Sequence, residues 1–161
     1  MRTEAILMRD GQVVERLGLN QLVAQLLEAG LEVAEPIRDR GIDLIAYSER
    51  TKPRSKFHAR PIQLKSAWSA SFRVDVKYRR ASDLIIAFVW HSGEPSKTVT
   101  YALSSAEVES VATAMGWGWK KWGSWTTNSP SVKLRQALEP YRMSPEKWWR
   151  LVIRSRTKIS R

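Results

Sequence analysis

The feature that most constrains this fold is an apolar run near the middle of the chain. Residues 83–90 read DLIIAFVW, and no polar side chain follows the initial Asp83. A strand with one face in solvent alternates apolar and polar residues, whereas a strand covered on both faces is apolar almost throughout. The run therefore predicts a central β-strand with other elements packed against both faces of its sheet.

The patterns on either side of this run predict further strands. Residues 31–37 and 42–48 are short apolar runs separated by the turn RDRG, which is typical of a hairpin. Residues 61–67 (PIQLKSA), 72–78 (FRVDVKY) and 98–104 (TVTYALS) also have strand character. Together with the central run, these segments predict a mixed sheet of about five strands.

Helical patterns flank the strand segments, so the predicted class is α/β. Apolar residues recur at helical spacing up to residue 28, in a helix that begins near Gln12 or Asn20. A second helix is expected over 105–115, with Ser104 or Ser105 as its N-cap. We expect these two helices to flank the sheet.

The length of 161 residues, with no repeat or low-complexity tract, suits one domain with its own core. We expect a single domain over the whole chain, with a helical extension from about residue 126. Two short helices, each following a Ser-Pro step, are predicted over 129–141 and 144–153. In the second of them, Trp148 and Trp149 are expected to pack onto the sheet.

The charge balance points to a polyanionic partner. Lysine and arginine total 27 against 16 acidic residues, which gives a formal charge of +11 and a pI near 10.3. This balance favours nucleic acid, although ribosomal, chromatin and membrane-surface proteins share it. The absence of cysteine excludes disulfides, thiolate nucleophiles and cysteine-ligated zinc.

Nothing in the sequence indicates a membrane segment. No stretch reaches the roughly 20 apolar residues that span a bilayer, and the first residues lack the pattern of a signal peptide. We therefore expect a soluble protein of the cytoplasm with no membrane partner.

Three polar side chains stand out within the predicted strands. Asp43 in GIDLIAY lies among apolar residues, where an isolated carboxylate costs several kcal/mol unless it is paired or bound to metal. In PIQLKSA, Ile62 and Leu64 share one face of the strand, so Gln63 and Lys65 share the other. These patterns predict a site that combines a carboxylate, an amide and an ammonium group.

The motifs GIDLIAY and IQLK resemble those of the PD-(D/E)XK nuclease superfamily, which includes resolvases and some homing endonucleases. A Gln-x-Lys variant of its motif occurs in a subset of the family that includes a group of homing endonucleases. The resemblance implies a restriction-endonuclease-like fold and hydrolysis of DNA phosphodiester bonds with Mg²⁺ or Mn²⁺ as cofactor. It assigns Asp43 and Gln63 as metal ligands, Leu64 as a ligand through its backbone carbonyl, and Lys65 as the residue that orients the attacking water. Gln63 carries no charge where an acid is usual, which should weaken Mg²⁺ binding.

The family also has an acidic residue on the helix before the hairpin. The position that matches in this chain is Asn20, which can ligate only through its amide carbonyl. Glu15 is the alternative if the helix starts early enough to bring it to the site. If neither reaches the site, Asp43 is the sole acidic ligand.

Basic residues outside these motifs are candidates for contact with nucleic acid. The segment over 49–60, which precedes IQLK, is expected to be an exposed basic loop beside the site. The segment GWGWKKWGSW places two lysines among tryptophans, which suits either stacking on bases or packing against the core. The candidate contact residues are Arg50, Lys52, Arg54, Lys56, His58, Lys120 and Lys121.

The sequence therefore predicts a metal-dependent DNA endonuclease that acts on duplex or branched DNA. Cutting both strands normally requires two active sites, so a homodimer or a higher homo-oligomer is expected. The alternatives are a catalytically inactive DNA-binding module on the same fold and an RNA-associated basic protein. In the simplest structural interpretation, Asp43 binds backbone amides at a strand end, and Gln63 and Lys65 form the polar face of an edge strand.

Overall fold

A computed structural model describes residues 10–38, 40–48, 57–118 and 123–153. It confirms the α/β class and the mixed sheet of five strands. The sheet contains β1 (Glu32–Ala34), β2 (Leu44–Ser48), β3 (His58–Ser66), β5 (Ile85–Trp90) and β6 (Val99–Ser104). The order across the sheet is β1-β2-β3-β5-β6, and only β3 and β5 are parallel neighbours.

Four α-helices and three short 3₁₀ helices accompany this sheet in the described residues. The α-helices are α2 (Gly11–Glu28), α3 (Ser105–Ala114), α5 (Val132–Leu138) and α6 (Pro145–Ile153). The 3₁₀ helices are η1 (Val76–Arg80), η2 (Pro95–Lys97) and η3 (Glu139–Tyr141). No helix in these ranges has the length and apolar character that a membrane crossing requires.

The apolar run forms β5, and all six of its residues are buried. Ile85, Ala87 and Val89 belong to a core cluster that includes residues of α2 and α6. The alternate residues of β5 belong to a second cluster, which includes residues of α3 and α5. The prediction of a strand covered on both faces is therefore confirmed.

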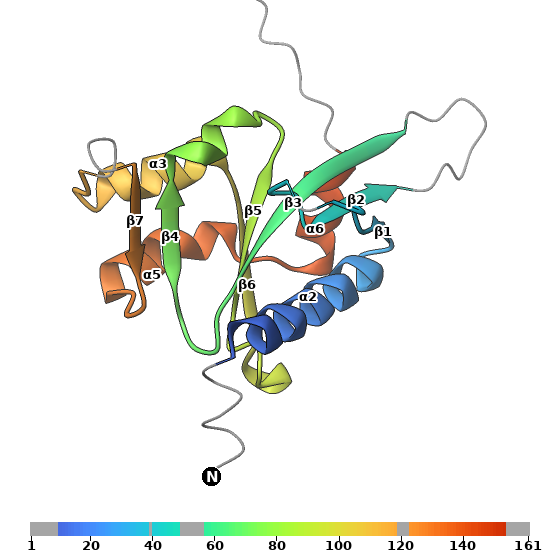
Figure 1. Cartoon of the computed structure of the whole chain (residues 1–161), viewed down its shortest axis with the longest axis horizontal. Coiled ribbons are helices and arrows are strands. Elements are labelled where there is room, and N and C mark those ends of the chain that lie inside the picture. The colour runs from blue at the N-terminus through green and yellow to red at the C-terminus, as the bar shows by residue number, and fades with distance from the viewer. Residues whose placement is uncertain (1–9, 39, 49–56, 119–122, 154–161) are drawn as a thin grey trace, which may run out of the picture.

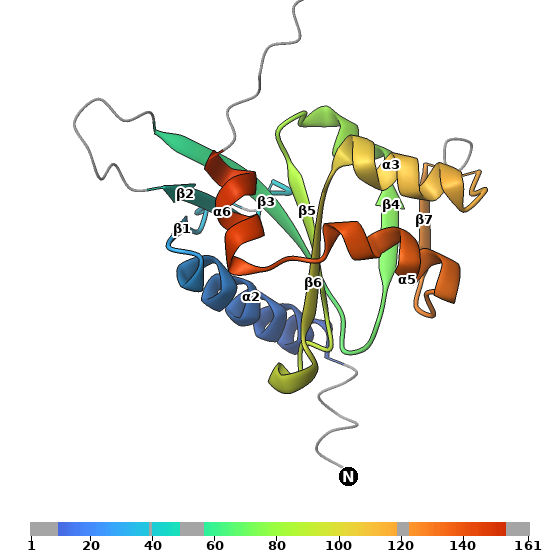
Figure 2. The same ribbon diagram turned by 180° about the vertical axis from the view of Figure 1, so that it is seen from behind.

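The helices divide between the two halves of the molecule. Figure 1 shows α2 and α6 beside β1, β2 and β3, whereas α3 and α5 lie beside a separate two-stranded sheet. The view from behind in Figure 2 shows the same division. Because α6 contacts α2, β2 and β3, the C-terminal segment adds to the core on the α2 side.

The helix boundaries follow from capping chemistry. Of the two starts considered for the first helix, the structure shows the earlier one, because the Asp10 side chain accepts hydrogen bonds from the amides of Gln12 and Val13. The N-cap of α3 is Ser104, which forms a capping box with Glu107.

The segment over 72–78 differs from its prediction as one strand of the main sheet. Only β4 (Phe72–Asp75) is extended, and it pairs with β7 (Ser124–Thr127), a strand that the sequence did not predict. The chain then turns into η1, because the Asp75 side chain accepts the backbone amide of Lys77. β3 also differs, since it starts at His58, inside the predicted loop.

The C-terminal helices form, with two differences from prediction. α5 starts at Val132 with Ser131 as its N-cap, so it begins later than the predicted range of 129–141. In α6, Trp148 is buried as expected, but the expectation for Trp149 is wrong, because 38% of this residue is exposed. Adjacent helical residues point about 100° apart, so two neighbouring tryptophans cannot both face one sheet.

Candidate functional site

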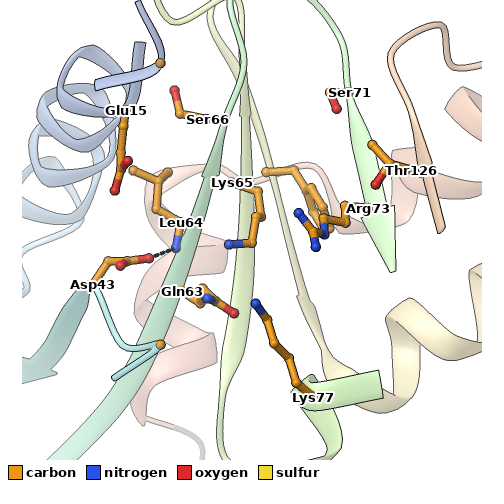
Figure 3. Close-up of a pocket in the computed structure, with 13 residues that line it drawn as sticks. Glu15, Asp43, Gln63, Leu64, Lys65, Ser66, Ser71, Arg73, Lys77 and Thr126 are labelled. Atoms are coloured by element: carbon orange, nitrogen blue, oxygen red, sulfur yellow. Dashed lines mark hydrogen bonds between the residues drawn. The ribbon is translucent and has the colours of Figure 1, made fainter. Parts of the chain in front are cut away.

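A pocket of about 510 Å³ opens between β3, the first turns of α2 and the β4–β7 pair. Figure 3 shows its side chains converging from elements that are distant in the sequence. The charged and amide side chains that line it are Glu15, Asp43, Gln63, Lys65, Arg73 and Lys77. The pocket thus brings together the three residues on which the sequence prediction depended.

The alternation of β3 places Gln63 and Lys65 in this pocket. Ile62 and Leu64 pack into the core on the α2 side of the sheet. Gln63 and Lys65 point to the opposite face, where Lys65 pairs with Phe88 of β5, which also lines the pocket. Gln63 is only 6% exposed, so its amide is held largely out of solvent.

Asp43 stands immediately before β2, where that strand stops pairing with β3. The last residue pair between these strands is Leu44 with Ile62, and the Asp43 amide donates to the Ile62 carbonyl at 2.9 Å. One residue further, the Asp43 carboxylate accepts the backbone amide of Leu64, with 2.5 Å between N and Oδ2. The carboxylate therefore replaces a strand carbonyl as acceptor, as the simplest structural interpretation expects, and it also faces the pocket (Figure 3).

Of the two candidate helical residues, Glu15 lines the pocket and Asn20 does not. Five helical positions correspond to a rotation of about 140° around the axis, so the two side chains cannot face the same place. Asn20 is exposed to solvent. The structure therefore places Glu15, and not Asn20, at the site.

A contact between α2 and β3 fixes Glu15 relative to Lys65. The hydroxyl of Ser66 donates to the carbonyl of Val14 at 2.6 Å and lies 2.7 Å from the hydroxyl of Ser92. Gly18 is what permits this approach, since a Cβ at that position would overlap the side chain of Ser66. The residues next to Glu15 and Lys65 are thus joined directly.

The surroundings of Lys65 lower its pKa below the ordinary value for lysine. Burial is the main cause, and the nearby cations Lys77 and Arg73 act in the same direction. The carboxylates of Asp43 and Glu15 raise it in part. The ammonium group of Lys65 therefore loses its proton more readily than that of a surface lysine.

Arg73 and Lys77 were not among the predicted site residues. The alternation of FRVDVKY places Arg73 on the face opposite Phe72 and Val74, which is a signal that the sequence contained. The sequence did not show that this face lies across from Lys65, because that placement depends on the pairing of β4 with β7.

The structure describes one of the seven predicted nucleic-acid contacts, His58. Arg50, Lys52, Arg54, Lys56, Lys120 and Lys121 fall outside the described residues. His58 is at the start of β3, seven positions from Lys65, which corresponds to about 23 Å along a strand. It does not line the pocket.

The described tryptophans of the Trp-rich segment favour packing over base stacking. The rings of Trp117 and Trp125 stack with centroids 3.4 Å apart, and Trp117 also lies against Phe72. Both tryptophans pack against the core cluster on the α3 side of the sheet.

The donor set at the pocket suits a hard divalent cation. In the part of the chain that the structure describes, no three side chains from His, Cys, Asp and Glu gather as a metal-binding group. The pocket offers the carboxylates of Asp43 and Glu15 and the amide of Gln63. Mg²⁺ commonly takes one or two carboxylates and completes its shell with water and substrate phosphate, so this set fits it.

Comparisons of the chain with protein-family models, with curated proteins and with solved structures find no match. The interpretation of the site therefore rests on its own geometry and chemistry.

Proposed function

We propose that this protein is a metal-dependent endonuclease that hydrolyses phosphodiester bonds of DNA on a restriction-endonuclease-like fold. The observation that carries the proposal is the convergence of Asp43, Gln63 and Lys65 with Glu15 in one open pocket. Their order along the chain, with a helical acid, an Asp at a hairpin strand and a Gln-x-Lys strand, is that of the PD-(D/E)XK superfamily. The formal charge of +11 supports a polyanionic substrate.

The residues that would hold Mg²⁺ or Mn²⁺ are Asp43, Glu15 and Gln63, with the backbone carbonyl of Leu64 as a further oxygen donor. When bound, such an ion stabilises negative charge on the phosphate and lowers the pKa of a water molecule. The hydrogen bond from the Leu64 amide holds the Asp43 carboxylate in one orientation at the pocket.

Lys65 has the properties of a residue that positions the attacking water. Its ammonium lies between the acidic side chains and the basic ones in Figure 3. Because its pKa is lowered, it accepts or donates a proton closer to neutral pH than an ordinary lysine does. Phe88, which pairs with Lys65 across β3 and β5, also lines the pocket.

One observation favours the second candidate, a DNA-binding module without catalysis. Among the described lining residues there are two carboxylates, and that of Asp43 already accepts the Leu64 amide. Gln63 adds no charge where the family has an acid, so this site would bind Mg²⁺ more weakly than a site with a third carboxylate. On this alternative the pocket binds phosphate groups and does not cleave the backbone.

Incubation of the purified protein with supercoiled plasmid and Mg²⁺ or Mn²⁺ separates these candidates. If the protein is the proposed endonuclease, the plasmid becomes nicked or linear. The product should be lost in Lys65→Ala and Asp43→Asn. It should be retained in Lys97→Ala, a control on η2 away from the pocket. Binding without cleavage in either metal would select the inactive module.

Light scattering on the DNA complex tests the proposed homodimer or higher homo-oligomer, which a monomeric complex would contradict.

A further inference from the structure

The pocket has a basic wall that the proposed cleavage chemistry does not use. Arg73 on β4 and Lys77 on η1 line the pocket on the side away from Glu15 and Asp43 (Figure 3). Both side chains extend toward Lys65. The two basic residues come from the β4–η1 segment, whereas the two acidic residues come from α2 and from the turn before β2.

A shared carboxylate holds the basic wall in place. Asp75 Oδ2 lies 3.2 Å from a guanidinium nitrogen of Arg73 and 3.6 Å from the ammonium of Lys77. The other oxygen of Asp75 accepts the backbone amide of Lys77 at 3.0 Å. The Asp75 side chain is mostly buried, so it is a fixed anchor that keeps both cations on one side of the pocket.

The anchor leaves the cations accessible. The side chains of Arg73 and Lys77 are 44% and 50% exposed, so both can contact a ligand in the pocket. The next arginine, Arg79, shows the contrast, because it forms an ion pair with Glu109 of α3 and does not line the pocket. A basic residue of this segment can therefore point away from the pocket, and Arg73 and Lys77 do not.

The charges at the pocket are separated into two walls. Glu15 and Asp43 lie on one side, and Arg73 and Lys77 lie on the other with their partner Asp75, which does not itself line the pocket. A guanidinium group matches the oxygens of a phosphate with parallel hydrogen bonds, and a lysine ammonium adds a point charge. Arg73 and Lys77 therefore face the pocket from the side opposite the acidic wall, where they can contact the oxygens of a phosphate.

We propose that Arg73 and Lys77, anchored by Asp75, form a clamp for a backbone phosphate of DNA that enters the pocket. This inference rests on the proposed function only in taking DNA as the substrate. The clamp would supply positive charge of the kind that a second metal ion supplies in sites with more carboxylates. It also separates the roles of the two walls, since the acidic wall holds the cation and the basic wall holds the substrate backbone.

Salt dependence of binding tests the clamp without requiring cleavage. Affinity for a fluorescent duplex is measured by anisotropy in EDTA over a series of KCl concentrations, for the wild type, Arg73→Ala and Lys77→Ala. Each clamp variant should bind about tenfold more weakly. Each should also make the plot of the logarithm of the association constant against the logarithm of salt concentration less steep, by about 0.9 in slope, the change expected for one lost phosphate contact.

Matched controls come from the same region. Arg79→Ala, which changes an arginine of η1 directed at Glu109, and Lys97→Ala, on η2, should keep the wild-type slope. Arg73→Lys should retain the slope and lose part of the affinity, because the charge remains and the planar fork does not.

The outcomes are distinct from those of the cleavage assay. Clamp variants with a wild-type slope, or controls that lose as much as they do, overturn the clamp even if the wild type nicks plasmid. A wild type that binds through Arg73 and Lys77 but never cleaves overturns the endonuclease and leaves the clamp in place. Because both side chains are exposed, loss of folding is not expected, and the thermal midpoint of each variant checks this.

Discussion

The backbone amide of Leu64 donates a hydrogen bond to the carboxylate of Asp43, across the point where β2 and β3 stop pairing. The bond gives Asp43 a structural role as well as its proposed role as a metal ligand. The two roles respond differently to substitution, because an amide oxygen can accept the Leu64 hydrogen but carries no charge.

Asp43→Asn should therefore remove function and spare the fold. We expect the rate of plasmid nicking to fall by about 100-fold or more, as for loss of one electrostatic group from an active site. The free energy of unfolding measured in urea should stay close to that of the wild type. Asp43→Ala should in addition lower the free energy of unfolding by about 2 kcal/mol, since it leaves the buried Leu64 amide without its acceptor. Equal loss of stability in both variants would contradict this division of roles.

Glu15 and Asn20 should differ in their effect on metal dependence. Glu15→Gln removes a carboxylate that lines the pocket, so the Mg²⁺ concentration for half-maximal nicking should rise about tenfold. Asn20→Ala changes an exposed side chain outside the pocket and should leave that concentration unchanged. A larger effect of Asn20→Ala would mean that Asn20, and not Glu15, is the helical ligand.

Lys65→Met should stabilise the protein at neutral pH while abolishing cleavage. The pKa of Lys65 is lowered mainly by burial, so the unfolded chain binds this proton more tightly than the folded one. The stability of the wild type should therefore rise with pH from the folded pKa up to the unfolded value of 10.5. The thermal midpoint of Lys65→Met should exceed that of the wild type at pH 7, and the difference should shrink as the pH approaches 10. A variant less stable at pH 7 would mean that attraction to Asp43 and Glu15 outweighs the cost of burial.

Gly18→Ala should disturb the contact between α2 and β3. The new Cβ would overlap the side chain of Ser66, so either the helix or the serine must move. We expect a loss of about 2 kcal/mol in the free energy of unfolding, typical of overpacking, and a fall in nicking rate as Glu15 shifts. Gly11→Ala is the matched control, because beyond its chain neighbours and the adjacent helix backbone no atom lies within 4 Å of a Cβ at that helical position. Its stability should be unchanged or slightly higher, since alanine favours helix more than glycine.

Trp117→Ala tests whether the Trp-rich segment packs or binds. Trp117 stacks on Trp125 and lies against Phe72, so its removal should lower the free energy of unfolding by about 2 kcal/mol. Affinity of the folded variant for duplex DNA should stay at the wild-type value. Trp149→Ala, which changes a tryptophan outside both core clusters, should lower the free energy of unfolding by less than Trp117→Ala does. Weaker DNA binding by Trp117→Ala at unchanged stability would favour base stacking.

Much of the sheet and part of the site could be predicted from local patterns. The apolar run of β5 and the alternation of Ile62 and Leu64 with Gln63 and Lys65 depend only on which face of a strand is covered, and periodicity reports this directly. Asp43 could be identified because a carboxylate among apolar residues requires a partner.

The parts that could not be predicted depend on contacts between distant segments. Whether Glu15 or Asn20 faces the site is set by the rotation of α2, which the approach of Gly18 to Ser66 fixes. β7 is four residues long and pairs with β4 some fifty positions earlier, so no local pattern identifies its partner. Arg73 was missed for the same reason, since alternation gives the face of a strand but not what lies opposite.

The two walls of the pocket are carried by elements that pack into different core clusters. Glu15 is carried by α2, whose buried leucines Leu22 and Leu26 belong to one cluster, whereas Arg73 and Lys77 stand beside Phe72 and Tyr78 of the other. Substitutions that change one wall should therefore leave the core packing beneath the other wall unchanged. On the proposed function, a change in the basic wall would alter contact with the DNA backbone and leave the residues for the divalent ion in place, and a change in the acidic wall would do the reverse.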